Sequence, residues 1–181
     1  MSETPIRTLI RDLESALREE GRSARVARLL ESYAGRQEDW REFALFQPGC
    51  YARNLVSGCE LFELLVLCWQ PGQVSPIHDH QGQRCWMSVL AGEIRERQYH
   101  LPRQGAAGPL VAGRTRVLER GAVAYIHDDI ALHDIGPVGR EGITLHLYSR
   151  PIRECRIFDP LTGAETLRGL VYHSIEGVVQ T

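Results

Sequence analysis

Two histidines separated by one residue are the strongest chemical signal in the sequence. His78 and His80 flank Asp79, and residues two apart on an extended chain project to the same side. Their imidazoles can therefore converge on one ion while Asp79 points away. Imidazole nitrogens are ligands for iron, zinc, copper and nickel. The pair predicts a metal site, and the alternative is two surface histidines on a loop.

The residues around this pair follow a defined spacing. Gly72 is separated from His78 by five residues, His80 from Cys85 by four, and Cys85 from Gly92 by six. This stretch resembles the first motif of the cupin superfamily, in which a glutamate ligand stands where this chain has Cys85. The resemblance implies a small jelly-roll barrel that binds a metal ion inside.

A second cupin motif implies a further histidine from a later hairpin, for which His127 and His133 are the candidates. Without the glutamate, three neutral imidazoles leave the full charge of a divalent ion uncompensated. Such a site attracts an anionic ligand such as a thiolate and lowers its proton affinity. Three protein ligands on an octahedral ion also leave three positions, enough for a bidentate substrate and dioxygen.

The stretch from Tyr51 to Asp159 is similar to the cysteine dioxygenase family, the thiol dioxygenase branch of the cupins. The matching segments are Tyr51–Leu55, Leu67–Trp69, Ile77–His80, Ala131–His133 and Leu145–Ser149. The resemblance implies one Fe(II) per chain, held by His78, His80 and His133. His127 lies six residues before His133 and has the same strand parity, so it is the fallback third ligand. It also implies that O₂ is added to the thiol sulfur of L-cysteine, which gives cysteine sulfinic acid.

Two further residues match the family's substrate-binding positions. Arg53 matches the arginine that binds the substrate carboxylate, and a guanidinium is a bidentate carboxylate partner that stays charged. Tyr51 matches the tyrosine beside it. The alternative for Arg53 is an ordinary surface arginine on a strand.

Thr144, His146 and Tyr148 alternate with two leucines, so their polar groups share one strand face. The family carries a Ser-His-Tyr relay on this strand, and Thr144 takes the serine position with a hydroxyl that still donates and accepts. The resemblance implies that His146 orients Tyr148, which hydrogen-bonds substrate or oxygen. Cys85 matches a cysteine that animal members crosslink to the relay tyrosine, so a Cys85–Tyr148 thioether is a hypothesis. The alternative is a histidine and a tyrosine that only serve the core.

Two other functions stay open. The nearest is a thiol dioxygenase acting on 3-mercaptopropionate, and Arg53 favours cysteine because that branch tends to place glutamine at this position. The second is a cupin that binds metal or a small ligand without redox turnover, as a sensor or binding module. It would require Arg53 and the polar strand face to be accidental.

Composition argues against several other classes. The 181 residues include 21 basic and 23 acidic side chains, a formal net charge of −2, which is unlike a nucleic-acid binder or a polybasic membrane patch. Every basic residue is an arginine, which excludes lysine chemistry. With no apolar leader and no disulfide framework among five cysteines, we expect a cytoplasmic protein. The expected partners are a small thiol and O₂, with no nucleic acid and no membrane, and a monomer is favoured.

Helices are predicted for the first part of the chain. Apolar residues recur at spacings of three and four, which predicts a first helix capped at Thr4-Pro5 and stopped by Gly21. A second helix is predicted from about 23 to 35, and a short third segment around 40–46. These helices would cover one side of a core.

After residue 50, short runs rich in Val, Ile, Leu and Tyr alternate with turn residues, which is typical of an antiparallel barrel. The predicted strands cover 51–57, 60–69, 85–91, 93–100, 114–119, 122–126, 131–136, 142–149, 154–158 and 165–173. We therefore expect a mainly β cupin double-stranded β-helix (jelly-roll barrel) with N-terminal α-helices. It would be a single domain over residues 1–181, with 1–47 helical and 50–175 forming the barrel. His100 and His173 are expected to be structural or solvent-exposed.

Overall fold

A computed structural model of the chain describes residues 3–19, 23–102 and 108–181. Two helices, α1 (Pro5–Arg18) and α2 (Ser23–Arg36), precede a 3-10 helix, η1 (Asp39–Phe43). The strands are β1 (Ala52–Cys59), β2 (Phe62–Trp69), β3 (Cys85–Ala91), β4 (Ile94–His100), β5 (Val111–Leu118), β6 (Val123–Ile126), β7 (Leu132–Pro137), β8 (Gly142–Tyr148), β9 (Glu154–Phe158), β10 (Glu165–Gly169), β11 (Ser174–Ile175) and β12 (Val178–Val179). Within the described ranges, no helix has the length and apolar character needed to span a membrane.

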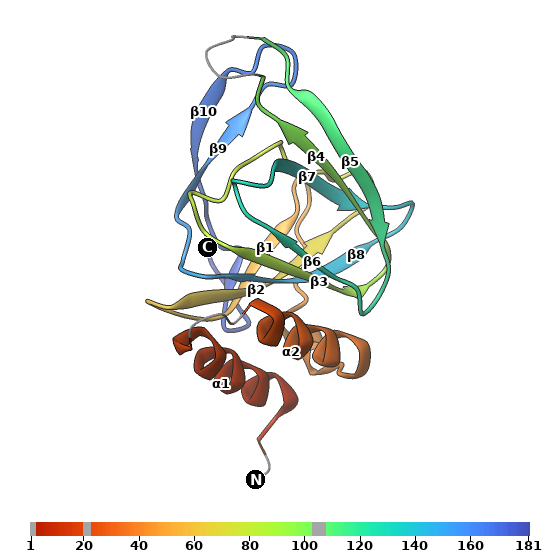
Figure 1. The fold of residues 1–181 in the computed structure, drawn as a ribbon. Helices are drawn as coiled ribbons and strands as arrows, with labels where there is room; N and C mark the ends of the chain where they lie inside the picture. Colours follow the sequence, from red (N-terminus) through yellow and green to blue (C-terminus); the bar gives the residue numbers. More distant parts are fainter. Residues whose placement is uncertain (1–2, 20–22, 103–107) are drawn as a thin grey trace.

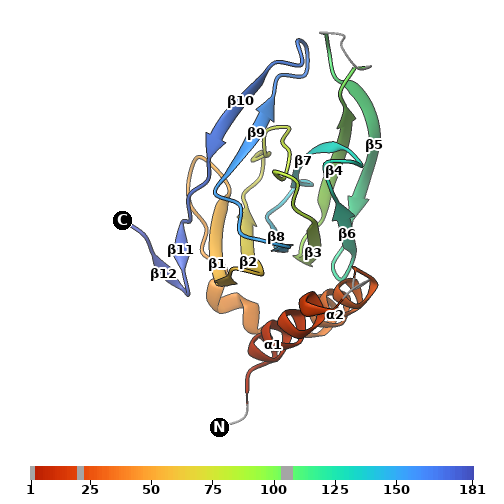
Figure 2. The same ribbon diagram turned by 60° about the vertical axis from the view of Figure 1, so that its left-hand side comes forward.

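The strands wrap around a common interior (Figures 1 and 2). A seven-stranded sheet has the order β12-β11-β1-β2-β8-β3-β6, and two smaller sheets have the orders β5-β4-β7 and β10-β9. The segment around His78 connects the smaller sheets, because His78 bridges His133 on β7 and Ile157 on β9. Both views place the helices at one end, with the β4–β5 and β9–β10 pairs extending away from them. The predicted mainly β jelly-roll barrel with N-terminal helices is confirmed.

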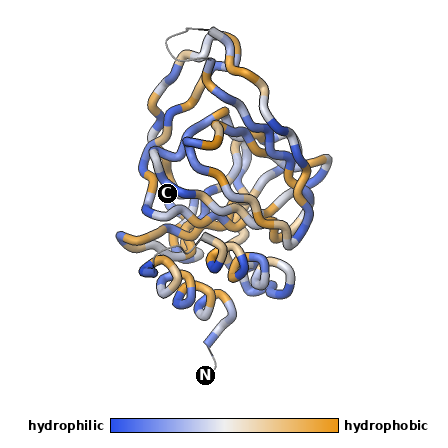
Figure 3. Tube along the Cα trace, in the orientation of Figure 1, coloured by the Kyte–Doolittle hydropathy of each residue, from blue (hydrophilic) through white to orange (hydrophobic). Residues whose placement is uncertain are grey.

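The seven-stranded sheet separates two apolar clusters. Leu147 on β8 packs in one cluster with Leu13 of α1 and Leu30 of α2, whereas Tyr148 belongs to the cluster inside the barrel. Figure 3 shows hydrophobic residues concentrated where the sheet meets the helices. Because side chains alternate along a strand, β8 directs its leucines to the helices and its polar row to the interior. The helices and the seven-stranded sheet share the first of these clusters. This contact supports a single domain over 1–181, which stays a prediction.

The start of α1 differs from the predicted capping. Thr4 occupies the N-cap position and Pro5 the first turn, but the Thr4 side chain makes no capping hydrogen bond. Instead the backbone N–H of Ile6 donates to Asp39 Oδ2 at 2.8 Å, so a distant carboxylate on η1 satisfies this helix end. Gly21, the predicted stop, lies outside the described residues, and α1 ends at Arg18.

The last part of the chain also differs from the prediction. The strand predicted over 165–173 ends at Gly169, because the chain then leaves β9 and crosses to β1, where the His173 N–H donates to the Arg53 carbonyl at 2.8 Å. Two short strands, β11 and β12, were not predicted, and β12 lies beyond the expected end of the barrel at 175. Strands of two residues are too short to produce a periodic hydrophobic pattern.

Candidate metal centre and the adjoining cavity

Three histidines converge inside the barrel. The candidate ligand atoms of His78, His80 and His133 all lie within 4.8 Å of one another, and the ring centroids are 4.7 to 5.1 Å apart. The backbones are locked together, since the His78 N–H donates to the His133 carbonyl at 3.0 Å and the His133 N–H to the His78 carbonyl at 3.3 Å. The pairing of the 78 segment with β7 therefore brings the third histidine to the first two.

Two of these histidines have partners that orient their rings. His78 Nδ1 lies 2.9 Å from the Pro76 carbonyl oxygen, and His133 Nδ1 lies 2.9 Å from Glu96 Oε1. The other Glu96 oxygen accepts a hydrogen bond from Arg116 Nε at 2.5 Å. Burial opposes the ionisation of Glu96, but His133 and Arg116 outweigh it and lower the pKa of this carboxyl. Partners at Nδ1 leave Nε2 free for a metal ion.

His80 carries the clearest mark of a ligand position. It is completely buried, and its Nε2 has no hydrogen-bond partner among the residues that the structure describes. Its Nδ1 lies 3.4 Å from Asp128 Oδ1 without forming a well-aligned hydrogen bond. Burial lowers the pKa of His80 and, reinforced by the other two imidazoles, lowers that of His78 well below its usual value. Neutral, buried imidazoles with an unpartnered nitrogen fit a bound divalent metal.

The remaining histidines outside β8 do not join this cluster. His127 Nε2 lies 3.2 Å from the Gly82 carbonyl oxygen, and its Nδ1 lies 3.2 Å from Asp129 Oδ2. The structure therefore does not bring the fallback ligand to the other histidines. His100 is exposed and His173 is half-buried.

Asp79 points away from the metal cluster, as the alternation predicted. Its Oδ2 accepts a hydrogen bond from Arg156 Nε at 2.8 Å, and its Oδ1 accepts one from the Arg156 backbone N–H at 2.8 Å. This ion pair between the buried Asp79 and the exposed Arg156 ties the histidine segment to β9, so Asp79 supports the position of the histidines on either side.

A connected row of polar groups runs along the interior face of β8. Trp69 Nε1 donates to Thr144 Oγ1 at 3.0 Å, and Thr144 Oγ1 lies 3.0 Å from His146 Nε2. The Tyr148 hydroxyl lies 3.4 Å from His146 Nδ1. Threonine therefore keeps the contact to histidine that the serine-containing pattern requires. The sequence does not assign Trp69 to this row, although a buried indole N–H needs an acceptor.

Cys85 adjoins this row from the neighbouring strand. It is the residue directly opposite Tyr148 in the antiparallel β3–β8 pair, and its sulfur lies 3.9 Å from His146 Nδ1. Burial raises the pKa of the Cys85 thiol and raises that of Tyr148 well above the usual value. Both groups are therefore protonated at neutral pH.

Arg53 on β1 is a buried cation beside the same row. Its Nε and Nη2 have no hydrogen-bond partner among the described residues, and Nη2 lies 3.7 Å from Glu63 Oε1. Its Cζ is 6.0 Å from the centre of the Tyr148 ring. Burying charged donors without an acceptor is unfavourable, so this position fits an anion-binding role. The alternative of an ordinary surface arginine is wrong, because only 7% of Arg53 is exposed.

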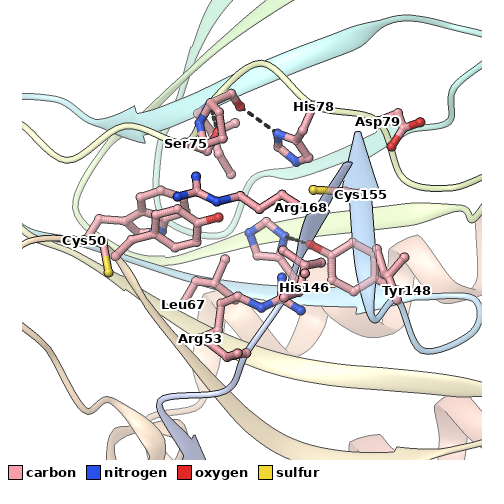
Figure 4. Close-up of a pocket in the computed structure, with 18 of the residues that line it drawn as sticks. Cys50, Arg53, Leu67, Ser75, His78, Asp79, His146, Tyr148, Cys155 and Arg168 are labelled. Atoms are coloured by element: carbon pink, nitrogen blue, oxygen red, sulfur yellow. Dashed lines mark hydrogen bonds between the residues drawn. The ribbon is translucent and has the colours of Figure 1, made fainter. Parts of the chain in front are cut away.

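A cavity of about 190 Å³ lies between Arg53, one metal-cluster histidine and the β8 row. Figure 4 shows Arg53, His78, His146 and Tyr148 around it. Tyr51 forms part of the wall and stacks on Trp69 with ring centroids 4.3 Å apart. Two further lining residues, on β9 and β10, are not assigned by the sequence patterns and become visible only from the strand pairing: Cys155 and Arg168.

Comparison with solved structures gives matches at low sequence identity. A protein with a double-stranded β-helix domain from Klebsiella pneumoniae matches with a TM-score of 0.48 and 19% identity, over 73% of this chain and 96% of that chain. An RmlC-like cupin protein from Desulfovibrio desulfuricans matches with a TM-score of 0.45 and 21% identity, over 65% of this chain and 98% of that chain.

Sequence comparison gives closer relationships. The family model for cysteine dioxygenase type I matches residues 2–160. Cysteine dioxygenase type 1 of Danio rerio is 38% identical over 141 residues, which is 76% of this chain and 70% of the relative. The Homo sapiens protein of the same name is 34% identical over 156 residues, 84% of this chain and 78% of the relative. The chain therefore belongs to the cysteine dioxygenase type I family.

Proposed function

We propose that this chain is an Fe(II)-dependent cysteine dioxygenase that oxidises the thiol of L-cysteine with O₂ to cysteine sulfinic acid. The observation that carries the proposal is the placement of Arg53. Its buried guanidinium, whose Nε and Nη2 make no hydrogen bond with the described residues, lines the same cavity as His78, a member of the three-histidine cluster. A small thiol acid satisfies both features, with its carboxylate on Arg53 and its sulfur toward the histidines.

The three histidines would hold one Fe(II) through Nε2, and the ion would supply a redox-active centre at which thiolate and O₂ meet. Arg53 would bind and orient the substrate carboxylate through its free donors. Tyr51 would form the wall beside the substrate with its ring held by Trp69. These contacts place the substrate sulfur and limit its motion, which is how oriented binding lowers a reaction barrier.

The β8 row would supply a hydrogen bond at the reacting atoms. Thr144 and His146 hold the Tyr148 hydroxyl in place, and this hydroxyl stays protonated because burial raises its pKa. Tyr148 can therefore donate to the substrate or to oxygen as negative charge develops. Removing water from the cavity strengthens that hydrogen bond.

The reaction balances without a further reductant. The thiolate R–S⁻ and O₂ give R–SO₂⁻: the O–O bond breaks, two S–O bonds form, and sulfur supplies all four electrons. The cavity therefore needs room for one thiol and one O₂, but no site for an organic redox cofactor.

Oxygen uptake by iron-loaded protein tests the proposal directly. We expect uptake with L-cysteine, weaker uptake with 3-mercaptopropionate, and weakest uptake with cysteamine, which lacks a carboxylate for Arg53. Mass spectrometry should find the sulfinic acid as the product. Faster uptake with 3-mercaptopropionate than with cysteine would identify 3-mercaptopropionate as the substrate. No uptake with any thiol would favour a metal-binding module without redox turnover.

A pair of histidine variants controls for nonspecific iron chemistry. His78→Ala should abolish uptake and reduce bound iron, because one of three ligands is lost. His127→Ala should retain both, because His127 lies outside the cluster. Equal losses in the two variants would contradict the assignment of His78.

The cytoplasmic location and the monomeric state are retained as proposals. The structure leaves all five cysteines as free thiols, which supports a reducing compartment. Light scattering on the purified protein tests the monomer, and a mass of two chains would contradict it.

A further inference from the structure

Arg168 on β10 is a second cation at the cavity. It pairs directly across the strands with Cys155 on β9, and residues opposite one another in an antiparallel pair project to the same face. Both side chains line the cavity, and Figure 4 shows the Arg168 side chain extending into it. Unlike Arg53, Arg168 is exposed, so it stands at the mouth of the cavity.

No described residue neutralises this charge. The Arg168 side chain makes no hydrogen bond or ion pair within the described ranges. The one carboxylate that lines the cavity, Asp79, is bound by Arg156 through its side chain and backbone. Glu165, on the same strand as Arg168, also lies toward Arg156, at 3.5 Å. Arg53 has Glu63 Oε1 3.7 Å from its Nη2, so among the described lining residues Arg168 is the guanidinium without a carboxylate partner.

A ligand with a single carboxylate leaves Arg168 without an anionic partner. In the proposed function, the single carboxylate of the thiol binds Arg53, and the substrate carries no second carboxylate for Arg168. A second carboxylate on the ligand could bind Arg168 in a cavity partly shielded from water, where charge-assisted hydrogen bonds are strong. The stacked pair of Tyr51 and Trp69 forms a rigid wall along the cavity.

We propose that Arg168 is a second anion-binding residue of this cavity, and that the cavity accepts thiol acids with two carboxylates. The inference deepens the proposed function and rests on it for turnover, but not for binding. Arg53 takes one carboxylate inside the barrel and Arg168 takes the other at the mouth. The oxidation step is the one already balanced above, with the sulfur of the dicarboxylate thiol as the electron donor.

Binding without turnover is the first test. Calorimetry under argon on full-length, iron-loaded protein compares dicarboxylates with monocarboxylates of the same chain length, succinate with butyrate and glutarate with valerate. We expect at least one dicarboxylate to bind about tenfold more tightly than its partner. Arg168→Gln should remove that advantage. Arg114→Gln, the same change at an exposed β5 position outside the cavity, should preserve it.

Turnover of a matched pair of thiols is the second test. Mercaptosuccinate is 3-mercaptopropionate with a second carboxylate on the carbon that bears sulfur. Arg168→Gln should lower kcat/KM for mercaptosuccinate about tenfold and change that for 3-mercaptopropionate less than twofold. Lowering both values equally would show a general structural effect and overturn the assignment.

The two tests separate failure of this inference from failure of the proposed function. Oxidation of cysteine without any dicarboxylate preference would overturn the role of Arg168 and leave the dioxygenase proposal intact. A dicarboxylate preference that depends on Arg168, in a protein that oxidises no thiol, would support the anion site and refute the dioxygenase. Undetectable binding of every dicarboxylate also overturns the role of Arg168.

Discussion

Cys85 lies directly opposite Tyr148 across the β3–β8 pair, with His146 Nδ1 3.9 Å from the cysteine sulfur and 3.4 Å from the tyrosine hydroxyl. Directly opposed residues in an antiparallel pair have Cβ atoms about 4.5 to 5.5 Å apart. Both side chains are buried, so the thiol and the hydroxyl are shielded from solvent. The fold therefore places a thiol and a phenol side by side at the edge of the cavity.

We predict that Cys85 and Tyr148 form a thioether during turnover with O₂ and thiol. One C–S bond forms while the S–H bond of Cys85 and a ring C–H bond of Tyr148 break, and the two protons and two electrons released reduce O₂ to hydrogen peroxide. The mass of a joined Cys85–Tyr148 peptide pair should be two hydrogens below the sum of its parts. Cys85→Ser should not show the loss, whereas Cys155→Ser should still show it. Uncrosslinked peptides after full turnover would refute the prediction.

Replacing Arg53 tests the carboxylate site. Arg53→Ala should raise KM for cysteine about 30-fold or more, because a charge-assisted pair of hydrogen bonds is lost. KM for cysteamine, which has no carboxylate, should change several-fold less in the same variant. Steady-state oxygen uptake measures both values. Equal effects on the two thiols would mean that Arg53 supports the fold and does not bind the carboxylate.

Replacing members of the β8 row should affect turnover more than substrate binding. Tyr148→Phe should reduce kcat roughly 100-fold, the usual cost of removing a donor to developing charge, with little change in KM. Thr144→Val should give a smaller loss, and Thr144→Ser should restore activity because it keeps the hydroxyl that contacts His146. An unchanged kcat in Tyr148→Phe would remove the tyrosine from the mechanism.

Replacing the carboxylate behind His133 should weaken metal binding. Glu96→Gln keeps the shape of the side chain but removes the charge that orients the imidazole, so iron affinity should fall about 10-fold to 100-fold. The measurement is iron retained during dialysis against a graded series of chelator concentrations. Glu119→Gln, at an exposed position, is the matched control, and equal iron retention in the two variants would contradict the role of Glu96.

The metal cluster shows which ligands local sequence spacing predicts and which it does not. The spacing of His78 and His80 predicts their convergence, because that relation is local. His127 and His133 are separated by six residues and are equivalent by strand parity. The family resemblance favours His133, whereas spacing alone does not separate the two, and the backbone pairing of the 78 segment with β7 places His133 beside the other ligands. The choice between the two candidates is therefore a property of tertiary pairing.

The same distinction between local patterns and contacts across strands applies to the rest of the site. The β8 row was predictable because alternation along one strand is local, and strands β3 and β9 begin and end where the pattern predicts. Glu96 and Arg168 act through partners on other strands, which no periodicity reveals. Asp39 stabilises the start of a helix 33 residues earlier, although a local Thr4 cap is the pattern that sequence favours.

The contact between Tyr33 of α2 and Asp39 of η1 predicts how stability depends on pH. The Tyr33 hydroxyl donates to Asp39 Oδ1 at 2.8 Å, and burial together with this carboxylate raises the pKa of Tyr33 well above its usual value of about 10. At pH 7, Tyr33→Phe should lower the free energy of unfolding by about 1 kcal/mol, the net value of one hydrogen bond.

Above about pH 10 the advantage of the wild-type protein over Tyr33→Phe should shrink. There the unfolded chain releases the Tyr33 proton while the folded chain keeps it, so the unfolded state binds fewer protons and the stability that Tyr33 contributes falls as pH rises. The fall approaches about 1.4 kcal/mol per pH unit. Urea unfolding of both proteins at pH 7, 9 and 11 measures the difference, in which all other titrating groups cancel. A difference that stays constant across this range would mean that Tyr33 titrates normally in the folded protein.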